Sequence, residues 1–312
     1  MHGATAAGLA LGLGVDAVLA DPRRLHPVAG FGTVAAALER AVHRDRYAPG
    51  VAYAAGLVGA AALVGAVSSS ATRTRPAARV AVVTAATWAV LGGTTLRREA
   101  AAMDALLRAG DLAGARGRVT HLCGRDPQQL DLDGLARATV ESVAENTSDA
   151  VVAPLFWGGV AGVPGLLAYR AVNTLDAMVG HRSPRHARFG WAAARADDLA
   201  NLLPARLTAA LTVALAPVVG GRPGAALSAW RRDGRKHPSP NAGPVEAAFA
   251  GALGRTLGGR LAYAGRVEDR PLLGDGPAPQ LDDVARAARL SLAVGAASAA
   301  LAVTARLALA RW

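Results

Sequence analysis

The chain has 312 residues, of which 52% are hydrophobic and 18% charged, and its formal net charge is +11 at pH 7. Cys123 is the only cysteine, which excludes an internal disulfide and a cysteine-based metal cluster. Long uncharged runs recur along the sequence and indicate an all-α, multi-pass integral membrane protein with about four to six spans.

Six apolar segments are candidates for crossing a bilayer. They are 4–20, 51–67, 80–96, 150–169, 207–221 and 290–310. Alanine favours insertion only weakly, so the first two are the least secure. Asp16 interrupts the first segment, which also lacks the basic start of a secretory signal, and we expect an uncleaved helix there. We expect one domain over residues 1–312, located in the cell membrane.

Two larger polar segments, 97–148 and 222–289, separate the apolar runs. In the first, apolar spacing and turn residues predict helices over 96–109, 112–119 and 130–145. In the second, Pro238, Pro240 and Gly243 exclude a helix interior and predict a turn-rich loop.

The apolar segment 150–169 contains helix-breaking residues near its middle. A continuous helix from Asp149 to Asn173 would separate its ends by about 36 Å, on opposite sides of a bilayer. A break at 162–165, where Gly162, Pro164 and Gly165 lie, would instead bring the polar ends together. We favour such a broken or re-entrant helical hairpin over 150–172 to a straight span.

Carboxylate and amide side chains gather on both sides of this segment. Glu141 and Glu145 share a helix face, and Asp149 would extend that stripe in an unbroken helix. Any single acid is explained at least as well by water or a neighbouring arginine. Burying so many acids without compensation is unfavourable, however, so we expect them to converge on one polar site. Oxygen ligands without histidine or cysteine clusters favour a hard cation such as Mg²⁺; the group comprises Glu141, Glu145, Asn146, Asp149, Asn173, Asp176, Asp197, Asp198 and Asn201.

Arginine carries almost all of the positive charge, because Lys236 is the only lysine. The arginines are spread through loops without interleaved aromatic residues, which favours loops beside anionic lipid over nucleic-acid binding. No Gly-x-x-x-x-Gly-Lys phosphate loop is present, so any use of ATP requires another architecture.

Several polar residues are candidates for binding an anion. Lys236 offers a point charge and Arg206 a planar guanidinium suited to phosphate or carboxylate. His237, Ser239 and Asn241 in the same loop could bind a ligand or cap a turn. The remaining histidines have no metal-like spacing along the chain and receive no role; they include His2, His43, His121, His181 and His186.

Ordered motifs nearly end to end resemble the CobD/CbiB family of cobalamin biosynthesis, the membrane-bound adenosylcobinamide-phosphate synthases. These motifs are Ala20-Asp21-Pro22 with His26-Pro27, Gly124-Arg-Asp126, Glu141 to Asp149, Val152 to Phe156, Asn173 to Gly180, Phe189 to Ala192, Asp197 to Asn201, Pro204 to Thr208, Lys236 to Gly243 and Arg270 to Asp275. Small departures from the family pattern occur at Pro127, Ala150, Ala177 and Ala196. Ala177 replaces a serine, which argues against an essential hydroxyl there.

The resemblance implies an ATP-dependent amide ligase. It would join (R)-1-aminopropan-2-ol or its O-phosphate to a propionate carboxylate of adenosylcobyric acid, giving adenosylcobinamide or its phosphate. The ligase would require ATP and Mg²⁺. Its partners would be the lipid bilayer and other membrane enzymes of cobalamin assembly, and it would not bind nucleic acid.

For such a ligase we predict three groups of site residues. Catalytic candidates, with Glu145 or Asp149 as general base, are Glu141, Glu145, Asn146, Asp149, Asn173 and Asp176. Metal candidates are Asp197, Asp198 and Asn201, and candidates for binding phosphate or corrin carboxylates are Arg206, Lys236, His237, Ser239 and Asn241.

Three other functions fit parts of the pattern. A corrinoid carrier or transporter would also place polar groups at a broken helix. A prenyl-type membrane transferase is suggested by Asp197-Asp198-x-x-Asn201, which resembles a diphosphate-binding motif. A noncatalytic membrane scaffold of the pathway would tolerate loss of the acidic residues.

Overall fold

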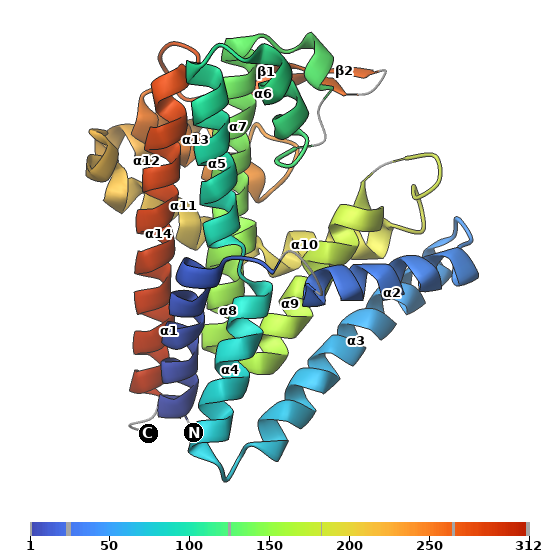
Figure 1. Ribbon diagram of the computed structural model, residues 1–312. Coiled ribbons are helices and arrows are strands. Elements are labelled where there is room, and N and C mark those ends of the chain that lie inside the picture. The colour runs from blue at the N-terminus through green and yellow to red at the C-terminus, as the bar shows by residue number, and fades with distance from the viewer. Residues whose placement is uncertain (1, 23–25, 124–125, 182, 264–265, 310–312) are drawn as a thin grey trace. The chain divides into compact units, whose positions relative to one another are not determined.

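The computed structural model describes residues 2–22, 26–123, 126–181, 183–263 and 266–309 (Figure 1). Its backbone contacts divide the chain into two compact units, each assembled from segments distant in sequence. Unit 1 comprises Met1–Gly92, Asp149–Asn201 and Ser298–Trp312, and unit 2 comprises Gly93–Ser148 and Leu202–Ala297. The expectation of one domain over the whole chain stays a prediction.

Unit 1 contains helices and no strand in its described part. Its helices are α1 (His2–Leu19), α2 (Pro27–Val42), α3 (Tyr47–Ala71), α4 (Pro76–Val90), α8 (Ala153–Ala161), α9 (Val163–Leu175), α10 (Trp191–Ala200) and the last part of α14 (Leu281–Ala308). Proline at the first turn of α2, α4, α8 and α9 suits a helix start, where its missing N–H would have no partner within the helix.

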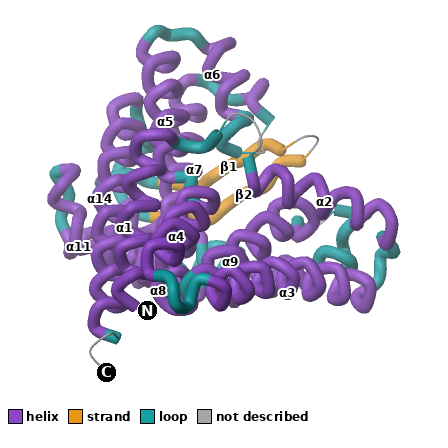
Figure 2. The backbone as a smooth tube through the Cα atoms, turned by 60° about the horizontal axis from the view of Figure 1, so that its bottom comes forward, coloured by secondary structure: helices purple, strands orange, loops and turns teal. Residues whose placement is uncertain are grey.

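Unit 2 contains shorter helices and one β-hairpin. Its elements are α5 (Gly93–Arg108), α6 (Leu112–Val119), α7 (Leu132–Thr147), α11 (Leu202–Leu215), α12 (Pro223–Asp233), α13 (Ala242–Leu253), β1 (Leu257–Tyr263), β2 (Arg266–Leu273) and the first part of α14. Figure 2 shows the hairpin as the one strand pair among helices in the described chain. The strands are antiparallel, with Gly259 opposite Arg270.

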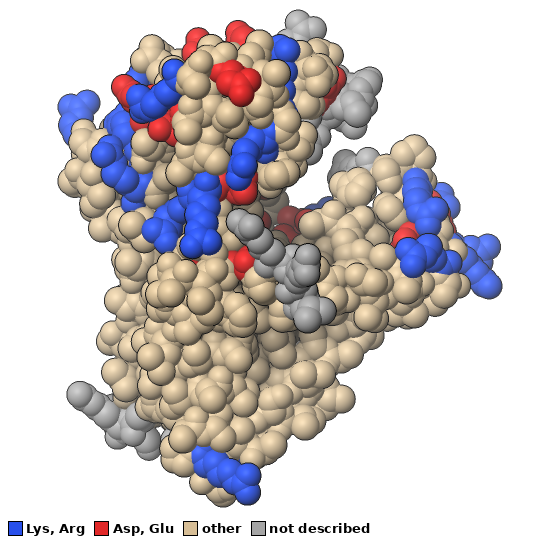
Figure 3. All heavy atoms as spheres, in the orientation of Figure 1, with Lys and Arg blue, Asp and Glu red and all other residues tan. Residues whose placement is uncertain are grey.

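Five stretches are long and apolar enough to cross a membrane, judged by length and composition; one of them, Pro76–Arg108, joins α4 and α5. They are His2–Leu19, Tyr47–Ala71, Pro76–Arg108, Leu202–Val219 and Leu281–Ala308. The predicted all-α membrane fold is confirmed. In Figure 3 the visible surface over α1, α3 and α4 is largely uncharged, and basic side chains appear at the α3–α4 turn.

The segment 150–169 is absent from these five stretches because it forms a helical hairpin. Helix α8 ends at Ala161, α9 begins at Val163, and Gly162 between them has φ +67° and ψ −143°. The turn satisfies its own backbone: Gly162 N–H donates to the Gly158 carbonyl at 2.9 Å, and Leu166 N–H donates to the Gly162 carbonyl at 3.0 Å. The predicted broken hairpin is therefore confirmed.

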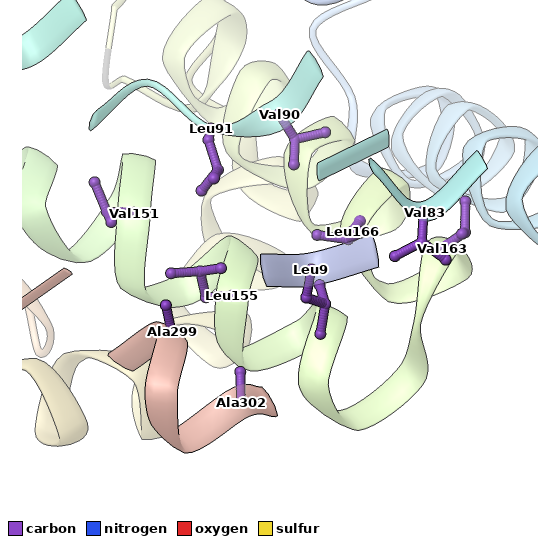
Figure 4. Packing of buried hydrophobic residues seen from close by; sticks show 10 residues of the cluster. All are labelled: Leu9, Val83, Val90, Leu91, Val151, Leu155, Val163, Leu166, Ala299 and Ala302. Carbon is purple, nitrogen blue, oxygen red and sulfur yellow. The ribbon is translucent and has the colours of Figure 1, made fainter. Parts of the chain in front are cut away.

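The core of unit 1 packs around this hairpin. Figure 4 shows buried apolar side chains pointing toward one another from α1, α4, α8, α9, α14 and the residues directly after α4 and before α8: Leu9, Val83, Val90, Leu91, Val151, Leu155, Val163, Leu166, Ala299 and Ala302. Gly8 and Gly12 let α1 approach α4 closely, because an added Cβ would meet the side chains of Val83 and Thr87. Small residues at helix contacts are typical of membrane helices.

Two features of the local structure differ from the sequence predictions. The apolar segment 80–96 does not lie within one helix, since α4 ends at Val90 and α5 begins at Gly93; Gly92 N–H donates to the Ala150 carbonyl at 3.0 Å. The β-hairpin was not predicted either. The predicted helices of the polar segment 97–148 are observed within a few residues of their expected ends.

We predict that Gly162→Ala lowers the free energy of unfolding by about 1–3 kcal/mol, because a residue with a Cβ is strained at this φ and ψ. Thermal unfolding in detergent measures the change. Gly14→Ala is the matched control, since Gly14 lies within α1 with open space at its Cβ position, and it should be neutral or stabilising. Equal stability of Gly162→Ala and the wild type would contradict the strained turn.

Candidate functional site

A polar network closes the open end of the α8–α9 hairpin in unit 1. The hydroxyl of buried Tyr169 lies 3.1 Å from the Asp149 carbonyl and 2.9 Å from Asn201 Oδ1. Asp149 and Tyr169 are 20 residues apart, and only the reversal at Gly162 brings them together. Asn201 is also almost fully buried.

The carboxylate of Asp197 is the charged centre of this network. It accepts hydrogen bonds from Asn201 Nδ2 at 3.0 Å and from Asn173 Nδ2 at 3.5 Å. Burial raises the pKa of Asp197 above its ordinary value; the two amide hydrogen bonds oppose this rise, and the charge of Asp198 adds to it. A carboxylate held by neutral amides in a desolvated position is one that a cation would stabilise.

Adjacent Asp198 has a different environment. Its Oδ2 pairs with Arg195 Nη1 at 2.9 Å on the same helix. Of the three predicted metal residues, Asp197 and Asn201 therefore contact each other, whereas Asp198 is engaged by a basic neighbour.

Two acids of the predicted catalytic group lie in π-helical turns. Asp149 is in the turn Ser148–Val152, where α7 leads into α8, and Asp176 begins the turn Asp176–Gly180 after α9. A π turn adds a residue to the helical repeat, and such turns are frequent at functional sites. Asp149 consequently leaves the regular α-helical stripe of Glu141 and Glu145. The Asp176 carboxylate lies against Gly180, where an added Cβ would overlap it.

The remaining predicted catalytic residues lie on α7 in unit 2. Buried Glu141 accepts a hydrogen bond from the Gly258 N–H of β1 at 2.6 Å, which fixes the hairpin to the helix. Asn146 donates to the Ser142 carbonyl one turn earlier, at 2.9 Å, and Glu145 is exposed. Glu141 and Glu145 therefore have unlike environments although they share a helix.

The loop around Lys236 is organised by Asp233 at the end of α12. Its buried carboxylate accepts from Arg232 Nη2 at 2.6 Å, Lys236 Nζ at 2.8 Å and the Gly274 N–H at 2.9 Å. The hydrogen bonds from Arg232, and then those from Lys236 and Gly274, hold the pKa of Asp233 far below its ordinary value.

The other predicted binding residues of unit 2 form contacts within the same loop and its neighbours. Arg206 Nη1 donates to Asn241 Oδ1 at 2.9 Å. Ser239 Oγ accepts from the Asn241 and Ala242 N–H groups at 3.3 and 3.2 Å, so it caps the start of α13. His237 Nε2 lies 2.8 Å from Arg270 Nη1 and 4.0 Å from Glu246 Oε1.

Comparison with known proteins assigns the chain to a family. The sequence pattern described as CobD/Cbib protein matches residues 9–291. The chain belongs to the CobD/CbiB family. The cobalamin biosynthesis protein CobD of Mycobacterium tuberculosis (strain ATCC 25618 / H37Rv) is 53% identical over 299 residues, covering 96% of this chain and 95% of that protein.

Other CobD/CbiB relatives carry the same name. The cobalamin biosynthesis protein CobD of Chromobacterium violaceum is 42% identical over 289 residues, covering 90% of each chain. That of Rhodobacter capsulatus is 53% identical over 200 residues, covering 64% of this chain and 62% of the relative. No solved structure matches the chain.

Sequence reasoning did not single out two residues that organise these groups of the CobD/CbiB chain. Tyr169 connects the hairpin to Asn201, and its position at the end of a long apolar run was the available signal. Asp233 pairs with Lys236, which follows it by three residues. Residues at this spacing are neighbours on a helical turn, so the pair could have been predicted from the sequence.

We predict that Asp233→Asn lowers the free energy of unfolding by about 1–3 kcal/mol at neutral pH, because it removes the charge that Arg232 and Lys236 share. Since the folded-state pKa of Asp233 is depressed, its contribution is present above the unfolded-state value of about 4 and declines as pH falls below it. The free energy of unfolding, measured from pH 7 to pH 3, should differ less between the variant and the wild type as the pH falls. A difference that stays constant with pH would contradict an ionised Asp233.

Proposed function

We propose that this CobD/CbiB protein acts in cobalamin biosynthesis as an ATP-dependent amide ligase. It joins (R)-1-aminopropan-2-ol or its O-phosphate to a propionate carboxylate of adenosylcobyric acid. Family membership supports the pathway, since the relatives are named cobalamin biosynthesis proteins. The observation that carries the chemistry is the half-buried Asp197 carboxylate, held by Asn173 and Asn201.

The reaction needs an activated carboxyl group. A carboxylate is a poor electrophile, so its oxygen first attacks the γ-phosphorus of ATP, ADP leaves, and an acyl phosphate forms. The uncharged amine then attacks the acyl carbon and phosphate leaves. One amide forms and one ATP becomes ADP and phosphate, with release of the amine proton.

The carboxylate of Asp197 is a ligand that fits Mg²⁺. Hard oxygen ligands suit this ion, and its charge would offset the burial that raises the pKa of Asp197. We assign Asp197 to hold it. Asn201 would join through Oδ1 after its amide group turns, because Nδ2 now faces Asp197 and Oδ1 accepts from Tyr169. Asp198 would reach the ion if it is released from Arg195. When bound, Mg²⁺ would neutralise the negative charge of the transferring phosphoryl group.

The acids near the hairpin are candidates for moving the amine proton. Asp149 lies in the π-helical turn at the start of the hairpin and is half-buried, whereas Glu145 is exposed. We favour Asp149 as the general base, because a less hydrated carboxylate can approach a bound amine without intervening water. Asn173 and Asp176, on and just after α9, would orient this part of the substrate.

The polar loop of unit 2 is suited to anionic groups. Lys236 and Arg206 are each held in place, by Asp233 and Asn241 respectively, so little side-chain entropy is lost when they bind an anion. His237 and the cap formed by Ser239 fix the loop backbone. We assign this loop to the phosphate or corrin carboxylates, and Glu141 to positioning β1 through Gly258.

The test is amide formation by purified protein in detergent. It receives adenosylcobyric acid, MgATP and either aminopropanol or its O-phosphate, and product mass and ATP cleavage are followed together. Amide formed with one ATP cleaved per product supports the ligase and identifies the amine. Corrinoid binding without either change would indicate a carrier or scaffold, and a requirement for an isoprenoid diphosphate would indicate a transferase.

We predict that Asp197→Asn reduces kcat by at least about 100-fold, because the variant loses the charge that holds the cation. Asp198→Asn should have a smaller effect, since its carboxylate is already paired with Arg195. The control is Asp104→Asn, which removes an acid that pairs with Arg108 on α5 and should leave kcat within about twofold. Wild-type kcat in Asp197→Asn would remove this residue from the mechanism.

A further inference from the structure

Three potential metal ligands meet in unit 1 at the end of α2. Glu39 lies in the last turn of α2, His43 directly follows that helix, and His186 comes from the segment that precedes α10. One carboxylate oxygen and one nitrogen of each imidazole all lie within 4.8 Å of one another. None of these residues takes part in the network around Asp197 described above.

The second nitrogen of each imidazole already has an oxygen partner. His43 Nε2 lies 2.9 Å from the Arg185 carbonyl, and because a carbonyl only accepts, this nitrogen carries a proton. In a neutral His43 ring, Nδ1 then carries the lone pair that can bind a metal ion. His186 directs Nε2 toward Glu39 at 3.2 Å and has its Nδ1 3.4 Å from Ser183 Oγ. Metal-binding histidines typically use one nitrogen for the ion and the other for such an oxygen.

Glu39 provides a carboxylate at this position. Its Oε1 accepts from Arg185 Nε at 3.1 Å and lies 3.2 Å from His186 Nε2. Arg185 Nη2 lies 2.8 Å from Glu39 Oε1, so its guanidinium provides the positive charge that a metal ion would otherwise provide. The Arg185 side chain is 55% exposed, so it can turn into solvent when another cation binds.

The surrounding contacts hold the ligands in place before any ion binds. Asp45 Oδ1 accepts from the backbone N–H groups of Arg188 and Phe189 at 2.7 and 3.1 Å, which fixes the segment after His186. The buried Phe189 ring packs against His43, with ring centroids 5.1 Å apart. Ligands fixed in this way lose little entropy on coordination.

We propose that Glu39, His43 and His186 bind Zn²⁺. Two imidazoles and one carboxylate form a donor set that suits this ion and leaves a fourth position for water. His181 is a neighbouring fourth candidate, because its ring centroid lies 5.6 Å from that of His186. The ion would link α2 to the segment that leads into α10.

The test uses full-length protein in detergent without a polyhistidine tag. Zn²⁺ is titrated against a fluorescent zinc indicator after treatment with a chelator, and bound metal is counted by mass spectrometry. We expect one tight Zn²⁺ per chain. His43→Ala and His186→Ala should each weaken binding by more than about tenfold. His121→Ala, which removes an exposed histidine beside Glu99, is the control and should bind like the wild type.

Arg185→Ala separates a metal site from a structural ion-pair cluster. Removing the competing guanidinium should tighten Zn²⁺ binding several-fold, whereas a purely structural cluster would only lose stability. Glu39→Gln keeps the side-chain shape and should weaken binding, so the proposal can be tested even if a histidine variant fails to fold. Absence of a tight site in the wild type, or equal affinity in the wild type and His186→Ala, would overturn the proposal.

Discussion

The reversal of the chain at Gly162 determines where the polar groups of unit 1 can lie. Backbone N–H and C=O groups in an apolar environment need internal partners, so a break there must satisfy itself. The turn does so through Gly158, Gly162 and Leu166, and Arg306 Nη2 lies 3.4 Å from the Gly158 carbonyl. With α8 and α9 antiparallel, Asp149 and Tyr169 meet at the open end of the hairpin.

The same arrangement determines which groups surround the Asp197 carboxylate. Its hydrogen-bond partners Asn173 and Asn201 are neutral, so they orient the carboxylate without cancelling its charge. Asp233 in unit 2 is the opposite case, because Arg232 and Lys236 provide full opposite charges. Burial raises the pKa of Asp197, whereas the hydrogen bonds from Arg232 and Lys236 lower the pKa of Asp233.

Local patterns predicted the helices and the hairpin break, because glycine, proline and apolar spacing act over a few residues. Gly162 and Pro164 identified the break in this way. Contacts between distant residues left no such pattern. Glu141 and Gly258 are 117 residues apart, so neither the β-hairpin nor its anchor followed from spacing. His43 and His186 likewise appear unrelated along the chain and meet only after folding. The predicted catalytic and binding roles remain predictions.

The single lysine, Lys236, completes the set of donors around Asp233. Arg232 uses Nε and Nη2 to bind both carboxylate oxygens, at 2.9 and 2.6 Å, which is the two-pronged geometry that guanidinium favours. Oδ1 can accept one more hydrogen bond, and the Lys236 ammonium donates it at 2.8 Å. A second planar guanidinium at position 236 would compete for the same two oxygens. The compact lysine ammonium suits this single contact, because it acts as a point charge and does not need both carboxylate oxygens.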